Sequence, residues 1–570
     1  MNLVQRFYDQ AYRYNDRSFI GYKAAGQWRT LSWSEVADYV STLSAYLSSM
    51  GIKKGERVLL LCENRPEWAI ADLAIMSLGA LVVPAYTTHS AEDLRHILKL
   101  TEPTTAIVSN QSFLDKVLEA NLSVDCVNNA IAIDEGLHAK PDWHTALHAW
   151  PNNEPGCERP DLSAVDEDDV CILIFTSGTS GKPKAAMLTH GNILHNVDTA
   201  KMILDTIPVN DQDRFLSFLP LAHAYEHTAG LHMPITQGAE IYYCESTDKL
   251  AQHLTEVSPS VCTAVPRLYD MLYVKIRASV EASSGAKRWL FNKTVEIGTK
   301  RADGLPLIVS EILLDPLLTK LVRKKLLQRF GGRIKYFVSG GAALNPEVGS
   351  FFTALGVGII QGYGQTEASP LITVNRPADV VMDSVGSAFD GVTLRLSEEG
   401  ELLVKGPNVM KGYWRDEAST AMTIRDGWLY TGDLATIDDR GIVRITGRKK
   451  DLIITSGGDN IAPSKIEGLL TLEKEVDQAV LIGDGKPWLA AILVPSEDLL
   501  NSVDDQKQVN ATLNAVLKRV NESLNPAERV RKFILHNEPF TIDNGFVTPT
   551  QKIKRGLVIE RFEEQINSLY

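Results

Sequence analysis

Residues 30 to 135 alternate apolar runs with segments of helical periodicity, and this alternation restricts the fold more than any other feature. Helical patterns at 36–47, 66–78 and 91–100 are separated by short, strand-like apolar runs at 57–61, 81–84 and 105–108. Successive strands joined by helices run parallel, because each helix returns the chain to the edge where the previous strand began. We therefore predict an α/β fold, with a large N-terminal domain of layered sheets that bind ligands at their strand ends.

The composition of the 570 residues is that of an ordinary globular chain, with 44% hydrophobic and 23% charged residues. A formal charge of −13 argues against nucleic acid as a partner and against binding acidic membranes through charge alone. The six cysteines lack the spacing of disulfides or zinc sites, and the N-terminus lacks the apolar core of a signal peptide. The longest apolar stretch, 73–83, is too short to span a bilayer. We expect a cytoplasmic protein that contacts a membrane peripherally at most.

A loop rich in hydroxyl groups and glycine follows the strand-like run 170–175. Its residues are Thr176, Ser177, Gly178, Thr179, Ser180 and Gly181, followed by Lys182, Pro183 and Lys184. Hydroxyls, free backbone N–H groups and ammonium groups at a strand end are suited to binding a polyphosphate. The spacing is not that of a Walker loop. The composition by itself fits either a phosphate site or an ordinary Gly/Ser-rich turn.

Two further strand-like runs, 334–338 and 356–361, each lead into small residues. The first is followed by Ser339-Gly340-Gly341-Ala342, and the second, which ends at Gln361, by Gly362-Tyr363-Gly364-Gln365-Thr366-Glu367. Small residues at adjacent strand ends let a flat ring approach the backbone, and Tyr363 offers a stacking face. Taken alone, Tyr363 also fits the role of a core aromatic residue.

Three other polar residues have an ordinary structural explanation as well as a functional one. His223 follows a strand that ends at Pro220, Asp433 follows a Thr-Gly turn, and Lys552 lies in a basic segment near the C-terminus. A histidine after a strand is often a hydrogen-bonded packing residue, an aspartate at a turn often serves the turn, and a lysine in a basic segment is normally solvated.

Five motifs, taken in chain order, resemble those of the AMP-forming acyl-CoA synthetases, members of the adenylate-forming superfamily. They are CILIFTSGTSGKPK at 171–184, LPLAH with Glu226, QGYGQTE at 361–367, DGWLYTGDLATIDDRGIVRITGRKKD at 426–451, and TPTQK at 548–552. The second, fourth and fifth motifs resemble the long-chain fatty acid–CoA ligase branch. The resemblance implies activation of a fatty acid by ATP to acyl-AMP, with release of pyrophosphate, and transfer of the acyl group to coenzyme A.

The resemblance also implies roles for individual residues. Catalysis is assigned to Lys552, Thr366 and His223, and Mg²⁺ binding to Glu367 and Thr179. The acyl pocket is expected at Tyr225, Gly341 and Gly362. ATP and AMP are expected to contact Thr176, Ser177, Gly178, Thr179, Ser180, Lys184, Gly341, Ala342, Gln361, Gly362, Tyr363, Gly364, Thr366, Asp433 and Arg448. Three departures from the family pattern are visible, at Ala185, Gly447 and Asp459.

The resemblance divides the chain at the charged run Lys449-Lys450-Asp451. Residues 1–448 would form the adenylation domain, including a small β-rich subdomain from Gly386 to Ile445. Residues 449–570 would form a mobile α+β lid that carries Lys552, with Lys554 as a less favoured alternative. The lid is expected to rotate about Lys450 between the two reactions, bringing Gly457 and Gly458 to the site of coenzyme A. A charged run between two packed units is also typical of a solvated turn.

Residues 317–330 form a basic amphipathic pattern in which Leu317, Leu318, Leu321, Val322 and Leu326 are predicted to share one face, opposite Lys320, Arg323 and Lys324. This helix could rest on a membrane or, as we favour, pack its apolar face on the core. Three alternative functions stay open at this stage. They are a fatty acyl-AMP ligase that delivers to a carrier protein, a coenzyme A ligase for aryl or bile-acid carboxylates, and a lipid-binding or scaffold protein without activity.

Overall fold

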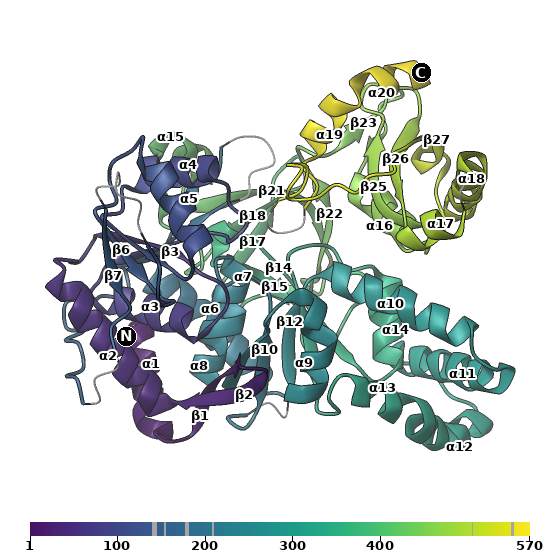
Figure 1. The fold of residues 1–570 in the computed structure, drawn as a ribbon. Coiled ribbons are helices and arrows are strands. Elements are labelled where there is room, and N and C mark those ends of the chain that lie inside the picture. The colour runs from purple at the N-terminus through teal and green to yellow at the C-terminus, as the bar shows by residue number, and fades with distance from the viewer. Residues whose placement is uncertain (139–144, 153–155, 177–181, 208–209, 504, 549–551) are drawn as a thin grey trace.

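The computed structural model describes residues 1–138, 145–152, 156–176, 182–207, 210–503, 505–548 and 552–570 (Figure 1). One sheet has eight strands in the order β19-β9-β8-β4-β3-β5-β6-β7. Its outer strands are β19 (Gly412–Tyr413) and β9 (Ala185–Thr189) on one side and β6 (Asn129–Ala132) and β7 (Ala146–Ala149) on the other. Its centre is parallel, as predicted, and consists of β8 (Val170–Phe175), β4 (Leu81–Pro84), β3 (Arg57–Leu61) and β5 (Thr105–Val108). These strands are short and apolar because both faces of the sheet are covered.

The second sheet has nine strands, and its central part, from β1 to β14, is parallel. In sheet order the strands are β16 (Ser387–Ala388), β15 (Leu371–Val374), β14 (Gly358–Gly364), β13 (Tyr336–Ser339), β12 (Val261–Ala264), β10 (Arg214–Ser217), β11 (Glu240–Tyr243), β1 (Ser18–Ala24) and β2 (Gln27–Ser32). Ser339 lies opposite Gln361 in the pairing of β13 with β14. The two predicted loops of small residues therefore leave the sheet side by side.

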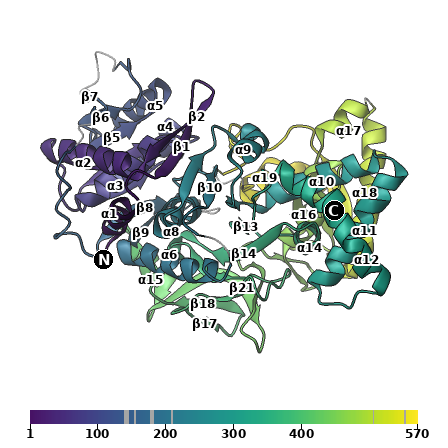
Figure 2. The same ribbon diagram turned by 90° about the horizontal axis from the view of Figure 1, so that it is seen from below.

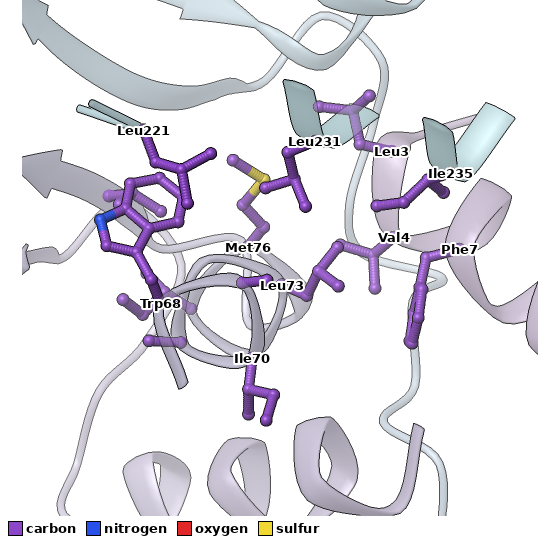
Figure 3. Close-up of a cluster of buried hydrophobic side chains, with 14 of the residues drawn as sticks. Leu3, Val4, Phe7, Trp68, Ile70, Leu73, Met76, Leu221, Leu231 and Ile235 are labelled. Atoms are coloured by element: carbon purple, nitrogen blue, oxygen red, sulfur yellow. The ribbon is translucent and has the colours of Figure 1, made fainter. Parts of the chain in front are cut away.

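Helix α3 (Pro66–Ser77), which is buried at every position except Glu67, lies at the centre of the N-terminal core. Its sequence is apolar on every side, which is typical of a helix that is surrounded by other elements. Figure 3 shows its side chains against those of α1 (Leu3–Tyr14) and the segment 221–235; the labelled residues are Leu3, Val4, Phe7, Trp68, Ile70, Leu73, Met76, Leu221, Leu231 and Ile235. This cluster ties the two sheets together and fixes how their strand ends face each other.

The β-rich subdomain is an antiparallel sheet of five strands. They are β17 (Thr393–Leu396), β18 (Glu401–Lys405), β20 (Ile424–Arg425), β21 (Trp428–Ile437) and β22 (Val443–Arg448). The pairing of β21 with β22 places Asp433 opposite Arg448. The sheet register thus joins two residues that lie 15 positions apart in the sequence.

The C-terminal unit, from Lys449 onward, packs helices on the sheet β25 (Val476–Ile482), β26 (Leu489–Pro495) and β27 (Val530–Leu535), and lies at the top of Figure 1. Its helices are α16 (Pro463–Thr471), α17 (Glu497–Ser502), α18 (Gln506–Glu522), α19 (Arg555–Arg561) and α20 (Glu563–Leu569). The unit has its own apolar core, formed between the sheet and α16 and α18. This is the α+β architecture expected for a lid.

The prediction for residues 317–330 is wrong in part. The segment is α12 (Val309–Leu318), a π-helical turn (Thr319–Arg323) and α13 (Lys324–Arg329), not one regular helix. Leu318 and Leu326 are buried, but Leu317 and Leu321 are exposed. The reason is that a π-turn changes the angular spacing of side chains, so residues predicted to share a face are separated.

Arg323, predicted for the solvated side, is buried as well. It pairs with Asp315 at 2.7 Å and donates to the Ala354 carbonyl at 3.0 Å. Because a buried guanidinium is stable only with such partners, the inward position of Arg323 depends on contacts far along the chain. In the described part of the chain, no helix has both the length and the apolar character needed to cross a bilayer.

Candidate active site

A cleft of about 360 Å³ opens where the strand ends of the N-terminal sheets, the β-rich subdomain and the C-terminal unit meet. Sequence-predicted residues line much of it: Thr176, Lys184, His223, Tyr225, Gly341, Gly362, Gly364, Thr366, Glu367, Arg448, Lys450 and Lys552. These residues come from segments that are separated by up to 376 positions along the chain. The fold therefore concentrates most of the predicted set in one place.

Several predicted residues lie elsewhere. Gln361 is buried within β14, and Ala342 is exposed but is not among the residues that line the cleft. Gly457 and Gly458 are exposed on the C-terminal unit and do not reach the cleft. Ser177, Gly178, Thr179 and Ser180 lie outside the described residues, so the tip of the predicted phosphate loop has no structural account here.

The two ends of that loop are well defined. β8 and β9 (Ala185–Thr189) form an antiparallel hairpin, and the Thr176 amide donates to the Lys184 carbonyl at 2.8 Å. The His96 ring nitrogen Nε2 lies 2.8 Å from the Pro183 carbonyl oxygen. Lys182 and Lys184 both line the cleft. The hairpin thus presents two cationic side chains at the place where a phosphate group would sit.

Asp433 is buried between two partners. Its Oδ2 accepts a hydrogen bond of 2.6 Å from the Tyr363 hydroxyl, and its Oδ1 accepts one of 3.0 Å from Arg448 Nε. Burial, and then the adjacent carboxylate, raises the pKa of Tyr363 well above its ordinary value, so the phenol stays protonated as the donor. The three side chains hold one another in fixed positions beside the glycines of β14. This arrangement suits a carboxylate that receives hydroxyl groups from a ligand.

Glu367, which follows β14, is held by a residue that sequence reasoning missed. The Tyr413 hydroxyl donates to Glu367 Oε1 at 2.7 Å, and the Lys184 ammonium lies 5.1 Å from the centre of the Tyr413 ring. Tyr413 comes from β19 (Gly412–Tyr413), which joins the edge of the eight-stranded sheet beside β9. A single half-buried carboxylate in a polar cleft fits a hard cation such as Mg²⁺, which takes few protein ligands.

Glycine is required at two positions of the cleft wall. A Cβ atom on Gly364 would lie 1.9 Å from the Pro370 carbonyl oxygen, and Gly341 has a φ of 83°. The first leaves no room for a side chain, and the second is a backbone conformation that other residues adopt only with strain. Both glycines therefore let the backbone form a smooth wall in the cleft.

Lys552 reaches the cleft from the C-terminal unit and lies near His223. Burial, and then the nearby Arg448, lowers the pKa of Lys552. Burial, and then the Lys552 charge, lowers the pKa of His223 to about 4. His223 is therefore neutral at pH 7, and because its Nδ1 accepts the Tyr225 amide at 3.2 Å, its proton is on Nε2. Lys552 therefore joins Lys182, Lys184 and Lys450 in the cleft lining, beside the neutral imidazole N–H donor of His223.

An apolar cavity of about 60 Å³ adjoins the cleft and shares Tyr225, Gly362 and Leu371 with it. Its remaining walls come mainly from α6 (His190–Leu204) and from the central strands of the nine-stranded sheet. Gly341, predicted for an acyl pocket, lines only the cleft. On the wall, Thr263 donates to Glu226 at 2.7 Å, and burial raises the pKa of Glu226 to about 7. An apolar chain could thus continue from the polar cleft into the interior.

Asp72, His227 and His232 form a second group of potential metal ligands, away from the cleft lining. His227 and His232 share a π-helical turn (His227–His232), which brings residues five apart onto one side. His227 Nε2 lies 3.2 Å from Asp72 Oδ1, and His232 Nε2 lies 3.4 Å from Asp72 Oδ2. All three are fully buried in the core. Because the histidines already partner the carboxylate, this group has a structural explanation without a metal.

Comparison with known proteins identifies the family. Residues 7–414 match the family model described as AMP-binding enzyme, and residues 450–570 match the model of the AMP-binding enzyme C-terminal domain. The chain belongs to the AMP-binding enzyme family. The predicted family resemblance is therefore confirmed.

Curated relatives of this AMP-binding enzyme extend over nearly its whole length. It is 32% identical to the long-chain-fatty-acid–CoA ligase FadD15 of Mycobacterium tuberculosis, covering 96% of this chain and 93% of the relative. It is 30% identical to human long-chain-fatty-acid–CoA ligase 1, covering 95% and 82%. It is also 28% identical to the chloroplastic long-chain-fatty-acid–[acyl-carrier-protein] ligase AEE15 of Arabidopsis thaliana, again covering 95% and 82%.

Solved structures share the fold of this AMP-binding enzyme. The adenylation domain of a carboxylate reductase from Mycobacterium chelonae superposes with a TM-score of 0.82 at 22% identity, covering 100% of this chain and 91% of that one. The anthranilate CoA ligase AuaEII superposes with a TM-score of 0.78 at 20% identity, covering 100% and 98%. These similarities confirm the predicted α/β fold class, with a large N-terminal and a smaller C-terminal unit.

Proposed function

We propose that this AMP-binding enzyme is a long-chain fatty acid–CoA ligase that works through an acyl-AMP intermediate. The observation that carries the proposal is the composition of the cleft. Lys552 of the C-terminal unit lines it together with Glu367 and Arg448, and an apolar cavity adjoins it. The curated relatives support the substrate class, since two of the three named above are long-chain-fatty-acid–CoA ligases. All four charged residues that the family resemblance predicts, Glu367, Asp433, Arg448 and Lys552, are present, which argues against an inactive lipid-binding protein.

In the first reaction, a carboxylate oxygen of the fatty acid attacks the α-phosphorus of ATP, and the bond to the β-phosphate breaks to release pyrophosphate. The main obstacle is the approach of one anion to another. The ammonium of Lys552 would stabilise the charge that develops on the α-phosphate and the carboxylate, and Lys182 and Lys184 would balance the departing phosphates. Asp433, oriented by Tyr363 and Arg448, would accept the ribose hydroxyls.

Thr366 and His223 complete the proposed polar set around the α-phosphate. The neutral His223 can donate through Nε2 without adding charge, and Thr366 follows β14 at the cleft wall. Mg²⁺ would be held by Glu367, with Thr179 as the second proposed ligand. When bound, the ion neutralises phosphate charge as a Lewis acid. Tyr413 keeps the Glu367 carboxylate turned toward the cleft.

In the second reaction, the thiol of coenzyme A loses its proton and attacks the acyl carbon, and the C–O bond to AMP breaks. Lys552 would have no role in this step, because the charge that it stabilises develops only while the carboxylate attacks the α-phosphorus. We propose that residues 449–570 rotate about Lys450 as a lid and bring Gly457 and Gly458 to the cleft. The exposure of both glycines, away from a cleft that Lys552 occupies, fits the arrangement for the first reaction.

The acyl chain would enter the apolar cavity past Tyr225 and Gly362. Since pockets for drug-sized ligands measure roughly 300–1,000 Å³, a cavity of about 60 Å³ must widen to admit a long chain. Side chains on α6 and the facing strands would have to change rotamer. We also propose a cytoplasmic enzyme that takes its substrate at a membrane surface, since long-chain acids partition into lipid.

The deciding experiment measures pyrophosphate and AMP formation with ATP, Mg²⁺ and a panel of acids from acetate to oleate, with and without coenzyme A. We expect activity with long-chain acids, and acyl-CoA and AMP only when coenzyme A is present. Preference for benzoate or cholate would instead indicate an aryl or bile-acid ligase. An absence of pyrophosphate with every acid would refute an active enzyme.

A second candidate is a ligase that delivers the acyl group to a carrier protein, and the similarity to the plant acyl-carrier-protein ligase favours it. Both candidates share the first reaction and differ in the thiol that attacks the acyl carbon. Purified enzyme charged with acyl-AMP should be offered coenzyme A and a phosphopantetheinylated carrier protein in parallel. Transfer to the carrier alone would select the second candidate.

A further inference from the structure

Helix α12 and the residues before it present an inverted amphipathic surface. A surface helix normally turns its apolar side chains inward and its charged side chains to water. In α12 the carboxylates of Glu311 and Asp315 are buried, whereas Leu313 is 75% exposed. The helix lies at the outer edge of the molecule in both ribbon views (Figures 1 and 2).

The buried carboxylates are fully partnered inside the protein. Glu311 pairs with Lys300 of α11 (Gly285–Ala302) at 2.7 Å, and its other oxygen accepts the Ile308 amide at 3.1 Å. Asp315 pairs with Arg323 at 2.7 Å and with Arg301 at 2.9 Å. These contacts fix the rotation of α12 about its axis. The outward position of Leu313 and Leu317 therefore follows from the ion pairs and not from loose attachment of the helix.

The outward side of α12 and the residues next to it carry a group of exposed apolar side chains, which we call the α12 face. Seven large apolar side chains that are at least 37% exposed lie within 17 residues. They are Leu305, Ile308, Val309, Ile312, Leu313, Leu317 and Leu321. Within α12 the spacing of Val309, Ile312, Leu313 and Leu317 places them on one side of the helix. Single exposed leucines are common on soluble proteins, but a cluster of this size marks a contact surface.

The α12 face continues directly into a basic surface. Lys320, Lys324, Lys325 and Arg329 are all exposed on the π-turn and α13. Between residues 304 and 330 the two acidic side chains, Glu311 and Asp315, both point inward. Although the chain has a formal charge of −13, it carries a local positive surface beside the α12 face.

We propose that the α12 face docks the enzyme on an anionic lipid bilayer. The leucines and isoleucines would enter the boundary between head groups and acyl chains, while the lysines would contact the lipid phosphates. A symmetric contact with a second copy would place these lysines against one another, so the charge favours an anionic bilayer. The proposal explains the source of a long-chain substrate and in that respect rests on the proposed function, but the surface stands independently of the reaction.

The test measures binding to vesicles by co-sedimentation, without ATP or fatty acid, using the full chain. Vesicles of neutral phosphatidylcholine are compared with vesicles that also contain 30 mol% phosphatidylglycerol, and we expect tighter binding to the anionic ones. Leu313→Gln with Leu317→Gln should weaken binding at least about tenfold, because two of the inserted apolar side chains are lost. Lys324→Gln with Lys325→Gln should weaken binding to anionic vesicles about twentyfold and make that binding less dependent on salt.

The matched control replaces two equally exposed apolar residues far from the α12 face, Leu122→Gln with Met422→Gln, which are 66% and 60% exposed in the native chain. This variant should bind like the wild type. All variants should keep the wild-type rate with an acid supplied in solution, so a failure of docking is distinct from a failure of the reaction. Equal binding by the wild type, the Leu313/Leu317 variant and the Lys324/Lys325 variant, or no binding at all, would overturn the proposal. So would a concentration-dependent dimer that these variants abolish.

Discussion

The two sides of the cleft are built differently. On the side of residues 1–448, the charged groups are locked by direct contacts, since Asp433 is held by Tyr363 and Arg448, and Glu367 by Tyr413. On the side of the C-terminal unit, the ammonium of Lys552 makes no hydrogen bond or ion pair with the described residues, although its backbone amide donates to Thr548 at 3.0 Å. Burial disfavours its charge.

Under the proposed function, this difference would separate a preformed nucleotide site from a cation that the C-terminal unit delivers to it. Locked acceptors lose little freedom when a ligand binds, which favours the same nucleotide position in both reactions. A lysine without fixed partners in the cleft can leave when its charge is no longer needed. The body of the enzyme should therefore serve both half-reactions, and Lys552 only one.

The strongest test of this contrast is Lys552→Ala. It should slow acyl-AMP formation by about two to four orders of magnitude, because one cation at the reacting phosphate is lost. Thioesterification of supplied acyl-AMP should keep most of its rate. Pyrophosphate release and single-turnover acyl-CoA formation measure the two steps. Lys554→Ala is the matched control, and an equal loss in both steps would contradict a delivered cation.

Asp433→Asn should affect both half-reactions, since the nucleotide is bound in each. The amide accepts weaker hydrogen bonds than the carboxylate, so we expect kcat/KM for ATP to fall about tenfold to a hundredfold. Tyr363→Phe removes one hydrogen bond to Asp433 and should cost about fivefold. Steady-state kinetics with ATP, and binding of AMP by calorimetry, check both variants. If Asp433→Asn slowed only acyl-AMP formation, the distinction between the two sides would fail.

Tyr413→Phe should change the response to Mg²⁺ more than the response to fatty acid. Loss of the hydroxyl frees the Glu367 carboxylate to rotate, and residues that orient metal ligands typically matter about tenfold in metal affinity. The Mg²⁺ concentration for half-maximal pyrophosphate release should rise accordingly, with little change in the KM of the acid. Tyr430→Phe, whose ring lies against Arg425, is the control. A uniform fall in stability of the Tyr413 variant, seen by thermal unfolding, would point to a packing role.

The smallest effect should appear in the pH dependence. Lys552 acts as a cation, so its contribution is present at low pH and lost as the pH rises through its pKa. Because burial lowers that pKa below the ordinary 10.5, kcat/KM for acyl-AMP formation should decline at an alkaline pH below the normal lysine range. Thioesterification should lack this decline. Lys552→Arg, which stays charged, should remove it from the first reaction, and an unchanged profile would exclude Lys552 as its source.

Much of the fold was predictable because short apolar runs specify strands locally. The strands at 57–61, 81–84, 105–108 and 170–175 were predicted at the observed bounds. The parallel pairing of β13 with β14 was also anticipated, since small residues follow both strands. By contrast, the strand β9 was not predicted, because a short strand paired across a hairpin has no strong periodicity of its own.

The sequence by itself determined the family, the order of the main motifs along the chain and the residue types at the cleft. Only the tertiary structure decided that Tyr413 supports Glu367, that Lys552 lies near His223, and that α12 turns Leu313 and Leu317 outward. The physical reason is that strand formation depends on neighbours along the chain. Ion pairs such as Asp315 with Arg301 and Arg323, and contacts across hundreds of residues, depend on how whole elements pack.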